Sequence, residues 1–295
     1  MLQLYDTYKE AADVLASTGV AGADPLAVPL HQARIHQETK FLAALSNRGD
    51  LPLVASTQEF NFGGLSLRRF TPLFLDVGKP PILYVRGGGW WYGTLDTHER
   101  TMRLIASMSR RVVFGVDYTR TPEAHYPVQK NQVIAAARHI CDCYSEHGKL
   151  VLFGESAGAT LALSAAQELR DNGDKSIVGL VLFYGNYAGP QPSKRPYSQW
   201  VWQQYLGTTE PSVNPYAIPV LCSMEGLPFI WLCVGENDAL LPDTLALTDK
   251  LNQANSPYTL TRYPGLPHGF VMWSAWVRPA LEAIVQACNA AAKMH

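Results

Sequence analysis

The sequence predicts an α/β fold in which a mostly parallel sheet is covered by helices on both faces. Two observations support this prediction. From residue 82 onward, short apolar segments alternate with longer segments of helical periodicity. The chain has 295 residues, of which 47% are hydrophobic. A chain of this length can bury a large core without a disulfide or metal to stabilise it.

The first part of the chain, up to about residue 48, is expected to be helical. Two segments show helical periodicity, separated by a break at residues 21–25, which contain glycine and proline. The apolar residues expected to share a face in each segment are Tyr5, Tyr8, Ala12, Val14 and Leu15, and then Ile35, Phe41, Leu42 and Leu45. The first residues are polar and acidic rather than basic and then apolar, so we expect no signal peptide.

Strands and helices alternate along the rest of the chain. Residues 54–70 predict a hairpin joined at Gly63-Gly64. Further strands are predicted at 82–85, 112–116, 149–153, 177–183, 228–234 and 258–263, and helices at 96–110, 127–147, 242–254 and 280–292. Ligands of such sheets bind beyond the carboxyl ends of the strands. Residues 185–227 interrupt the alternation and are rich in proline and aromatic residues, which predicts a lid or pocket wall.

A glycine-flanked serine follows the strand predicted at 149–153. Residues 154–158 have the pattern G-x-S-x-G, between an apolar strand and an alanine-rich helix. Gly154 and Gly158 permit a turn so sharp that the hydroxyl of Ser156 stands clear of the sheet. Free N–H groups at the start of the helix would favour developing negative charge there. The pattern predicts that Ser156 is a nucleophile.

A serine nucleophile needs a base, and the base needs an acid to orient it. Asp238 follows the strand predicted at 228–234, and His268 follows the last predicted strand. Both would therefore lie at the same edge of the sheet as Ser156. Among the eight histidines, His268 has this position between the last strand and the last helix. Glu236 and Asp243 are alternative candidates for the acid.

Three consecutive glycines, residues 87–89, follow the buried strand at 82–85. Without Cβ atoms, such a backbone can turn its N–H groups into a cavity. Two of these groups, together with the N–H of Ala157, would stabilise an oxyanion, and one donor of this kind contributes about 3 kcal/mol. A phosphate-binding loop is the alternative, but the spacing matches neither G-x-x-x-x-G-K-[ST] nor G-x-G-x-x-G.

Four motifs in order resemble the bacterial hormone-sensitive-lipase-like esterases. Residues 86–90 (RGGGW) and 93–98 (GTLDTH) resemble the family's HGGGW and GSLDTH segments. Residues 117–127 are similar to its DYRLAPEHPFP segment. Residues 154–158 (GESAG) match its nucleophile elbow, the sharp turn between strand and helix that carries the serine. The resemblance implies an α/β-hydrolase fold with a catalytic domain at 51–295 and a helical cap from residues 1–50 and 185–227. It also implies hydrolysis of small carboxylic esters without a cofactor, and oxyanion donors at Gly88, Gly89 and Ala157.

The sequence departs from the family at Arg86, where the family has the histidine of its HGGG motif. Arg86 would either shape the loop with its several donors, as that histidine does, or bring a positive charge to the pocket and favour acidic substrates. The acid motif also differs after Asp238, and Ala159 replaces the family's second glycine after the elbow.

A cluster of aromatic residues is expected to line or cover a confined apolar pocket: Trp90, Trp91, Tyr92, Trp200 and Trp202. Such a pocket favours short acyl groups or compact aryl esters. Two alternatives remain open at this point. The same three residues could hydrolyse an amide such as a formamide, or the chain could be a non-catalytic receptor for a small molecule.

Composition excludes several other classes of function. The net charge is −1 and is not gathered in blocks, which argues against nucleic-acid and anionic-membrane partners. The five cysteines have no disulfide or metal-ligand spacing, so we expect free thiols, no metal and a cytoplasmic location. The last strand and helix could form the edge of a homodimer.

Overall fold

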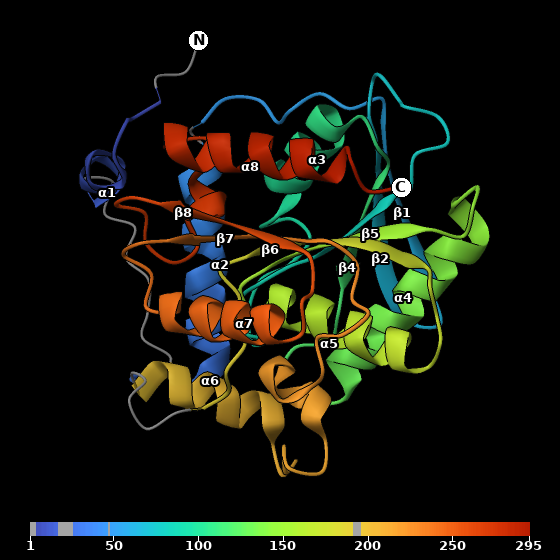
Figure 1. The fold of residues 1–295 in the computed structure, drawn as a ribbon. Coiled ribbons are helices and arrows are strands. Elements are labelled where there is room, and N and C mark those ends of the chain that lie inside the picture. Colours follow the sequence, from blue (N-terminus) through green and yellow to red (C-terminus); the bar gives the residue numbers. More distant parts are fainter. Residues whose placement is uncertain (1–3, 17–25, 47, 191–195) are drawn as a thin grey trace.

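The central sheet organises the molecule (Figure 1). The computed structural model describes residues 4–16, 26–46, 48–190 and 196–295. Within them, eight strands form one sheet in the order β1-β2-β4-β3-β5-β6-β7-β8. Strand β2 runs antiparallel to β1 and β4, and the remaining pairs are parallel. The strands are β1 (Ser56–Phe62), β2 (Leu65–Thr71), β3 (Ile82–Val85), β4 (Val113–Asp117), β5 (Leu150–Glu155), β6 (Ile177–Phe183), β7 (Ile230–Gly235) and β8 (Tyr258–Tyr263).

Helices cover both faces of this sheet, as predicted (Figure 1). Helices α3 (Glu99–Ser109) and α8 (Arg278–Ala291) pack on one face. Helices α4 (Val128–Tyr144), α5 (Ala157–Asp171) and α7 (Leu241–Gln253) pack on the other. Every residue of β3, β5 and β7 is buried. Strands buried on both faces read as continuous apolar runs, which is why the sequence predicts them well.

Two differences from prediction lie in the loops at the carboxyl ends of the parallel strands. The helix expected from residue 96 begins at Glu99. The reason is a turn in which the hydroxyl of Thr97 accepts the N–H of Thr94 at 2.9 Å, while the Thr94 hydroxyl accepts the N–H of Thr97 at 3.3 Å. The short 3-10 helix at Phe270–Trp273 was not predicted from the sequence.

The N-terminal segment forms two helices, α1 (Tyr8–Ala16) and α2 (Leu30–Ser46). The break expected at 21–25 lies outside the described residues. The expectation that Tyr5 belongs to the first helix is wrong. Its N–H donates to Trp276 and its carbonyl accepts from Arg278, so Tyr5 pairs with the chain just before α8.

The apolar face expected for the second helix is also wrong in part. In α2, Ile35 is 59% and Leu42 43% exposed. The helix instead turns polar side chains toward the protein. Arg34 donates to the carbonyls of Trp91 and Thr121 at 2.7 Å. Because these hydrogen bonds set the rotation of α2, its apolar periodicity does not predict its buried face.

The interruption at 185–227 contains helix α6 (Pro196–Leu206) and two 3-10 turns, Pro215–Ala217 and Pro219–Leu221. Helix α6 buries Val201, Trp202 and Tyr205 against the rest of the protein. In the described part of the chain, no helix has both the length and the apolar character needed to cross a membrane.

Candidate active site

Ser156 lies in the sharp turn between β5 and α5. Its φ is +53° and its ψ is −124°, a conformation that a side chain disfavours. The turn holds because the N–H of Ser156 donates to Phe183 at 2.9 Å and because glycines flank it. A Cβ on Gly154 would lie 2.5 Å from the carbonyl oxygen of Gly158. The elbow that the sequence predicts is therefore present.

The structure brings Ser156, His268 and Asp238 together at the carboxyl edge of the sheet. The Oγ of Ser156 lies 2.8 Å from Nε2 of His268. The Nδ1 of His268 lies 2.9 Å and 3.1 Å from the two carboxylate oxygens of Asp238. One of these oxygens also accepts the N–H of Leu240 at 2.7 Å, which fixes the carboxylate. The three residues meet because each follows a parallel strand of the same sheet.

The two alternative acids have other partners. Glu236 is exposed and pairs with Arg262 at 3.2 Å. Asp243, in the first turn of α7, accepts the N–H of Ala188 at 2.8 Å. The carboxylate of Asp238 has no exposed side-chain surface, so its hydrogen bonds to His268 are shielded from water.

The charge of Asp238 changes the acidity of His268. Partial burial of the imidazole by itself lowers the pKa of His268. The charge of Asp238 and its hydrogen bond outweigh this effect, so the pKa is raised above its ordinary value of 6.5. The imidazole still keeps 37% of its side-chain surface exposed, so a substrate can reach it.

Within the described residues, three backbone N–H groups of the glycine loop and the elbow are unused. Gly88 and Gly89 have φ values of +98° and +55°, which turn the loop after β3 sharply. The N–H of Ala157 is the first of α5 and has no partner within the helix. Among the residues that the structure describes, none accepts a hydrogen bond from the N–H groups of Gly88, Gly89 or Ala157. The two segments are close because Gly158 lies against the carbonyl of Val85.

Comparison with known proteins identifies the family. Residues 82–272 match the family described as the alpha/beta hydrolase fold. The chain belongs to the α/β hydrolases. It is 28% identical to an acetyl esterase of Salmonella paratyphi A over 249 residues, which cover 76% of this hydrolase and 74% of the relative.

Solved structures share this fold over nearly the whole chain. A thermophilic carboxylesterase cloned from a metagenomic library has a TM-score of 0.83 at 26% identity, covering 90% of this hydrolase and 98% of that chain. An esterase of the bacterial hormone-sensitive lipase family has a TM-score of 0.86 at 21% identity, covering 98% of this hydrolase and 99% of that chain. The second likeness concerns the fold alone. The family match, the acetyl esterase and the carboxylesterase confirm the resemblance to esterases of the α/β-hydrolase fold.

Arg86 binds the backbone of two segments that neighbour the glycine loop, at Tyr92 and Tyr118. Its side chain is fully buried. The guanidinium donates to Asp117 at 3.0 Å and to the carbonyls of Tyr92 at 3.0 Å and Tyr118 at 2.9 Å. It also lies 4.1 Å from the centre of the Tyr118 ring. The prediction that Arg86 lines the substrate pocket is therefore corrected. Its side chain has no exposed surface, and its hydrogen bonds to the surrounding backbone show that it shapes the loop.

Trp90, Trp91 and Trp202 are also buried rather than open to a ligand, with exposed fractions of 0%, 1% and 0%. Trp90 stacks on Tyr205 with ring centres 4.2 Å apart. Trp91 donates from its indole to the hydroxyl of Tyr197 at 3.1 Å. The expectation that these tryptophans line the pocket is corrected, because they pack the loop against α6.

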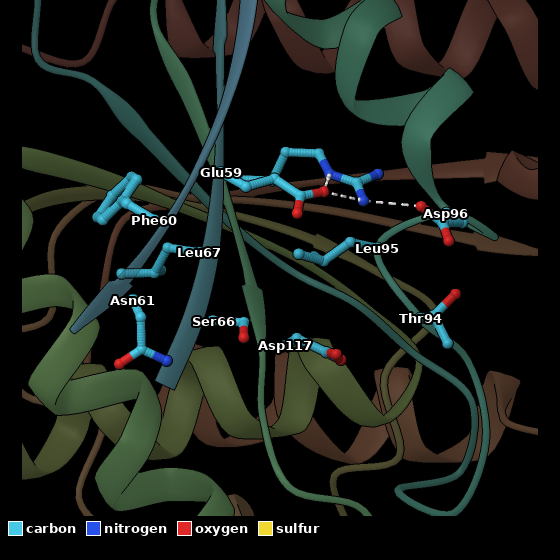
Figure 2. Close-up of a pocket in the computed structure, with 10 residues that line it drawn as sticks. Glu59, Phe60, Asn61, Ser66, Leu67, Thr94, Leu95, Asp96 and Asp117 are labelled. Atoms are coloured by element: carbon cyan, nitrogen blue, oxygen red, sulfur yellow. Dashed lines mark hydrogen bonds and ion pairs between the residues drawn. The ribbon is translucent and has the colours of Figure 1, made fainter. Parts of the chain in front are cut away.

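A polar groove of about 450 Å³ lies between the β1-β2 hairpin and the loop at residues 94–96 (Figure 2). Arg68, one of the lining residues, pairs with both Glu59 and Asp96. Asp117, which pairs with Arg86, also lines it. The lining residues include none of the predicted nucleophile, base and acid, so this groove is separate from their site.

The structure adds residues that the sequence analysis did not assign to the site. Arg34 and Glu38 of α2 bind the segment that follows the glycine loop, Glu38 by accepting the N–H of Gly93 at 3.0 Å. Glu155 contacts the glycine loop itself from β5. The charged residues of α2 carry no motif that would have pointed to them. Glu155 stands inside the G-x-S-x-G pattern, and this position next to Ser156 was the available signal.

Proposed function

We propose that this α/β hydrolase is a serine carboxylesterase that cleaves small, short-chain acyl or aryl esters through an acyl-enzyme intermediate. The observation that carries the proposal is the chain of hydrogen bonds from Ser156 through His268 to Asp238, together with three unused N–H donors. The similar proteins include an acetyl esterase and a carboxylesterase, so the amidase and receptor alternatives are not favoured.

In the proposed first half-reaction, Ser156 attacks the carbonyl carbon of the ester while Nε2 of His268 takes the hydroxyl proton. The carbonyl oxygen becomes an oxyanion and receives hydrogen bonds from the N–H groups of Gly88, Gly89 and Ala157. When the tetrahedral intermediate collapses, His268 protonates the leaving alkoxide. The acyl group stays on the oxygen of Ser156.

In the second half-reaction, a water molecule repeats these steps on the acyl-enzyme. Its proton goes to His268, its oxygen attacks the acyl carbon, and Ser156 leaves with the proton that His268 returns. Asp238 keeps Nδ1 of His268 protonated, so that Nε2 is the nitrogen that accepts. Its negative charge also stabilises the imidazolium that forms in each half-reaction.

We assign the cap to the described parts of residues 1–50 and 185–227, and the catalytic domain to 51–295. Helices α2 and α6 support this assignment because both pack on the segment that follows the glycine loop. Arg34 of α2 binds the carbonyl of Trp91, and Tyr197 of α6 binds its indole. Helices fixed in this way would confine the site and favour small acyl groups.

A panel of p-nitrophenyl esters tests the function. We expect kcat/KM to be highest for acetate and butyrate and to fall by more than about tenfold for acyl chains of ten carbons or more, since a confined pocket excludes long chains. The matching p-nitroanilides test amide cleavage. Faster turnover of anilides than of esters, or a preference for long chains, would contradict the proposal.

The pH dependence of kcat/KM follows from the raised pKa of His268. The base is active when neutral, and protonation at low pH removes it. We therefore expect activity to rise with pH, with a midpoint above the ordinary value of 6.5. Initial rates with a short ester between pH 5 and 9 measure this midpoint. A flat profile over a range in which the fold is stable would argue against a histidine base.

We also propose a cytoplasmic location, supported by five free cysteines. A homodimer remains part of the proposal as well. It is supported by β8, which pairs with β7 and forms one edge of the sheet.

A further inference from the structure

Glu155 has no role in the mechanism above, although it directly precedes Ser156. It is the last residue of β5, and its side chain is only 4% exposed. Burial of a carboxylate is unfavourable unless hydrogen bonds or a counter-charge compensate for lost water. A residue at this position that served packing alone would be apolar, as the rest of β5 is.

The carboxylate of Glu155 binds the glycine loop. Its Oε1 accepts hydrogen bonds from the backbone N–H of Gly87 and from Nε2 of His98, the second at 3.0 Å. A Cβ on Gly87 would collide with this carboxylate. The loop backbone can therefore approach Glu155 this closely only because residue 87 is glycine.

This hydrogen bond lies one residue before the proposed oxyanion donors. Gly88, Gly89 and Trp90 have φ values of +98°, +55° and +64°, and the last of these is strained for a tryptophan. Such a backbone keeps its shape only where contacts hold it. Arg86 holds this backbone through the carbonyl of Tyr92, and Glu155 holds it through the N–H of Gly87.

His98 keeps the Glu155 carboxylate in place. Its Nδ1 lies 3.1 Å from the carbonyl oxygen of Thr94 and 2.8 Å from the hydroxyl of Thr97. A carboxylate only accepts hydrogen bonds, so Nε2 of His98 carries the proton of its bond to Glu155. These contacts hold the Nδ1 side of the ring, so His98 keeps the orientation in which Nε2 donates to Glu155.

The negative charge of Glu155 also raises the pKa of His268, the proposed base. Burial lowers the pKa of His268, and the charges that raise it are those of Asp238, then Glu155, then Asp243. Tyr184 packs its ring on His268 with centres 5.0 Å apart. Burial and then the charge of Glu155 hold the pKa of Tyr184 well above its usual value.

We propose that Glu155 is a positioning residue for ester hydrolysis, which ties Gly87 to the elbow and so sets where the N–H groups of Gly88 and Gly89 lie relative to Ser156. Because Glu155 and Ser156 are consecutive, one hydrogen bond relates the donors to the nucleophile. His98 acts through Glu155. This inference rests on the proposed esterase function.

Two substitutions separate the hydrogen bonds from the charge. Glu155→Ala removes both, and we expect kcat for a short ester to fall by about 100-fold with KM within threefold, since displacement of the donors affects the transition state more than the bound ester. Glu155→Gln keeps an oxygen that can accept from Gly87 and His98. We expect it to recover kcat to within about tenfold of the native enzyme and to move the acid limb of the pH profile to lower pH, because the lost charge raised the pKa of His268.

A trifluoromethyl ketone, which forms a tetrahedral adduct with an active serine, measures the donors directly. Its Ki is expected to rise in Glu155→Ala by about the same factor as kcat/KM falls. The control is Glu282→Ala, which removes an exposed glutamate of α8 and should leave all of these values unchanged. If Glu155→Ala does not fold, His98→Ala and His98→Gln replace it, with kcat lowered in the alanine variant and restored in part by the glutamine amide.

The outcomes separate this inference from the function on which it rests. If the native enzyme hydrolyses none of the esters, the proposed function fails. If the native enzyme and Glu282→Ala are active and Glu155→Ala keeps native kcat, Ki and pH profile, the positioning role is overturned. A loss of activity that merely follows the fraction unfolded, with native kcat per folded molecule, overturns it as well.

Discussion

Replacing Ser156 with alanine is expected to lower kcat for a short ester by about 10⁶-fold, as loss of a serine nucleophile does in other hydrolases. The variant loses the atom that forms the acyl-enzyme, while the N–H donors and the pocket stay in place. The fold should be preserved, because alanine has the same Cβ as serine and meets the same steric demand at a φ of +53°. Initial rates and thermal unfolding of purified protein measure both effects.

Ser164 provides the matched control. It lies in the same helix, α5, and is fully buried, but it is two turns away from the elbow. Ser164→Ala is expected to change kcat by less than about twofold, because a buried hydroxyl far from the reaction affects stability alone. Retention of a hundredth or more of native activity by Ser156→Ala would contradict the assignment of the nucleophile.

Replacing Asp238 with asparagine is expected to lower kcat by about 10⁴-fold. The amide keeps the shape of the carboxylate and an oxygen for the N–H of Leu240, so the loop should stay folded. Its NH₂ group, however, favours the histidine tautomer in which Nε2 is protonated and cannot accept from Ser156. The remaining activity should show an acid limb at lower pH, because the charge of Asp238 no longer raises the pKa of His268.

Glu236→Gln is the control for this change. It removes a carboxylate two residues away, one that pairs with Arg262 at the surface. Exposed ion pairs contribute little to stability, and this variant should keep native kcat and pH dependence. A large loss in Glu236→Gln together with near-native activity in Asp238→Asn would reverse the assignment of the acid.

The candidate site could be predicted because its side chains follow strands that the sequence marks clearly. The parallel strands are buried on both faces and read as apolar runs, so their carboxyl ends can be placed to within a few residues. Ser156 and Asp238 follow such ends closely, whereas His268 follows the edge strand β8, which is only partly buried. The topology then brings them to one edge, although 112 residues separate the serine from the histidine.

The surroundings of the site depend on side-chain directions that the sequence does not determine. Trp90 and Trp91 lie in the same loop as the oxyanion donors, but positive φ values there turn their rings into the core. Arg86 is charged and follows a strand, yet carbonyl oxygens and Asp117 satisfy its donors within the protein. Helix α2 is oriented by Arg34 rather than by its apolar residues. In each case a tertiary hydrogen bond or backbone turn overrides the local pattern.

Covalent labelling tests the central assignment most directly. The native protein is treated with a fluorophosphonate, digested, and mapped by mass spectrometry, with Ser156→Ala treated in parallel. We expect one adduct, on the peptide that contains Ser156, formed in step with the loss of esterase activity and absent from the variant. Full esterase activity with no adduct on Ser156, or loss of activity with the adduct on another residue, would contradict the account.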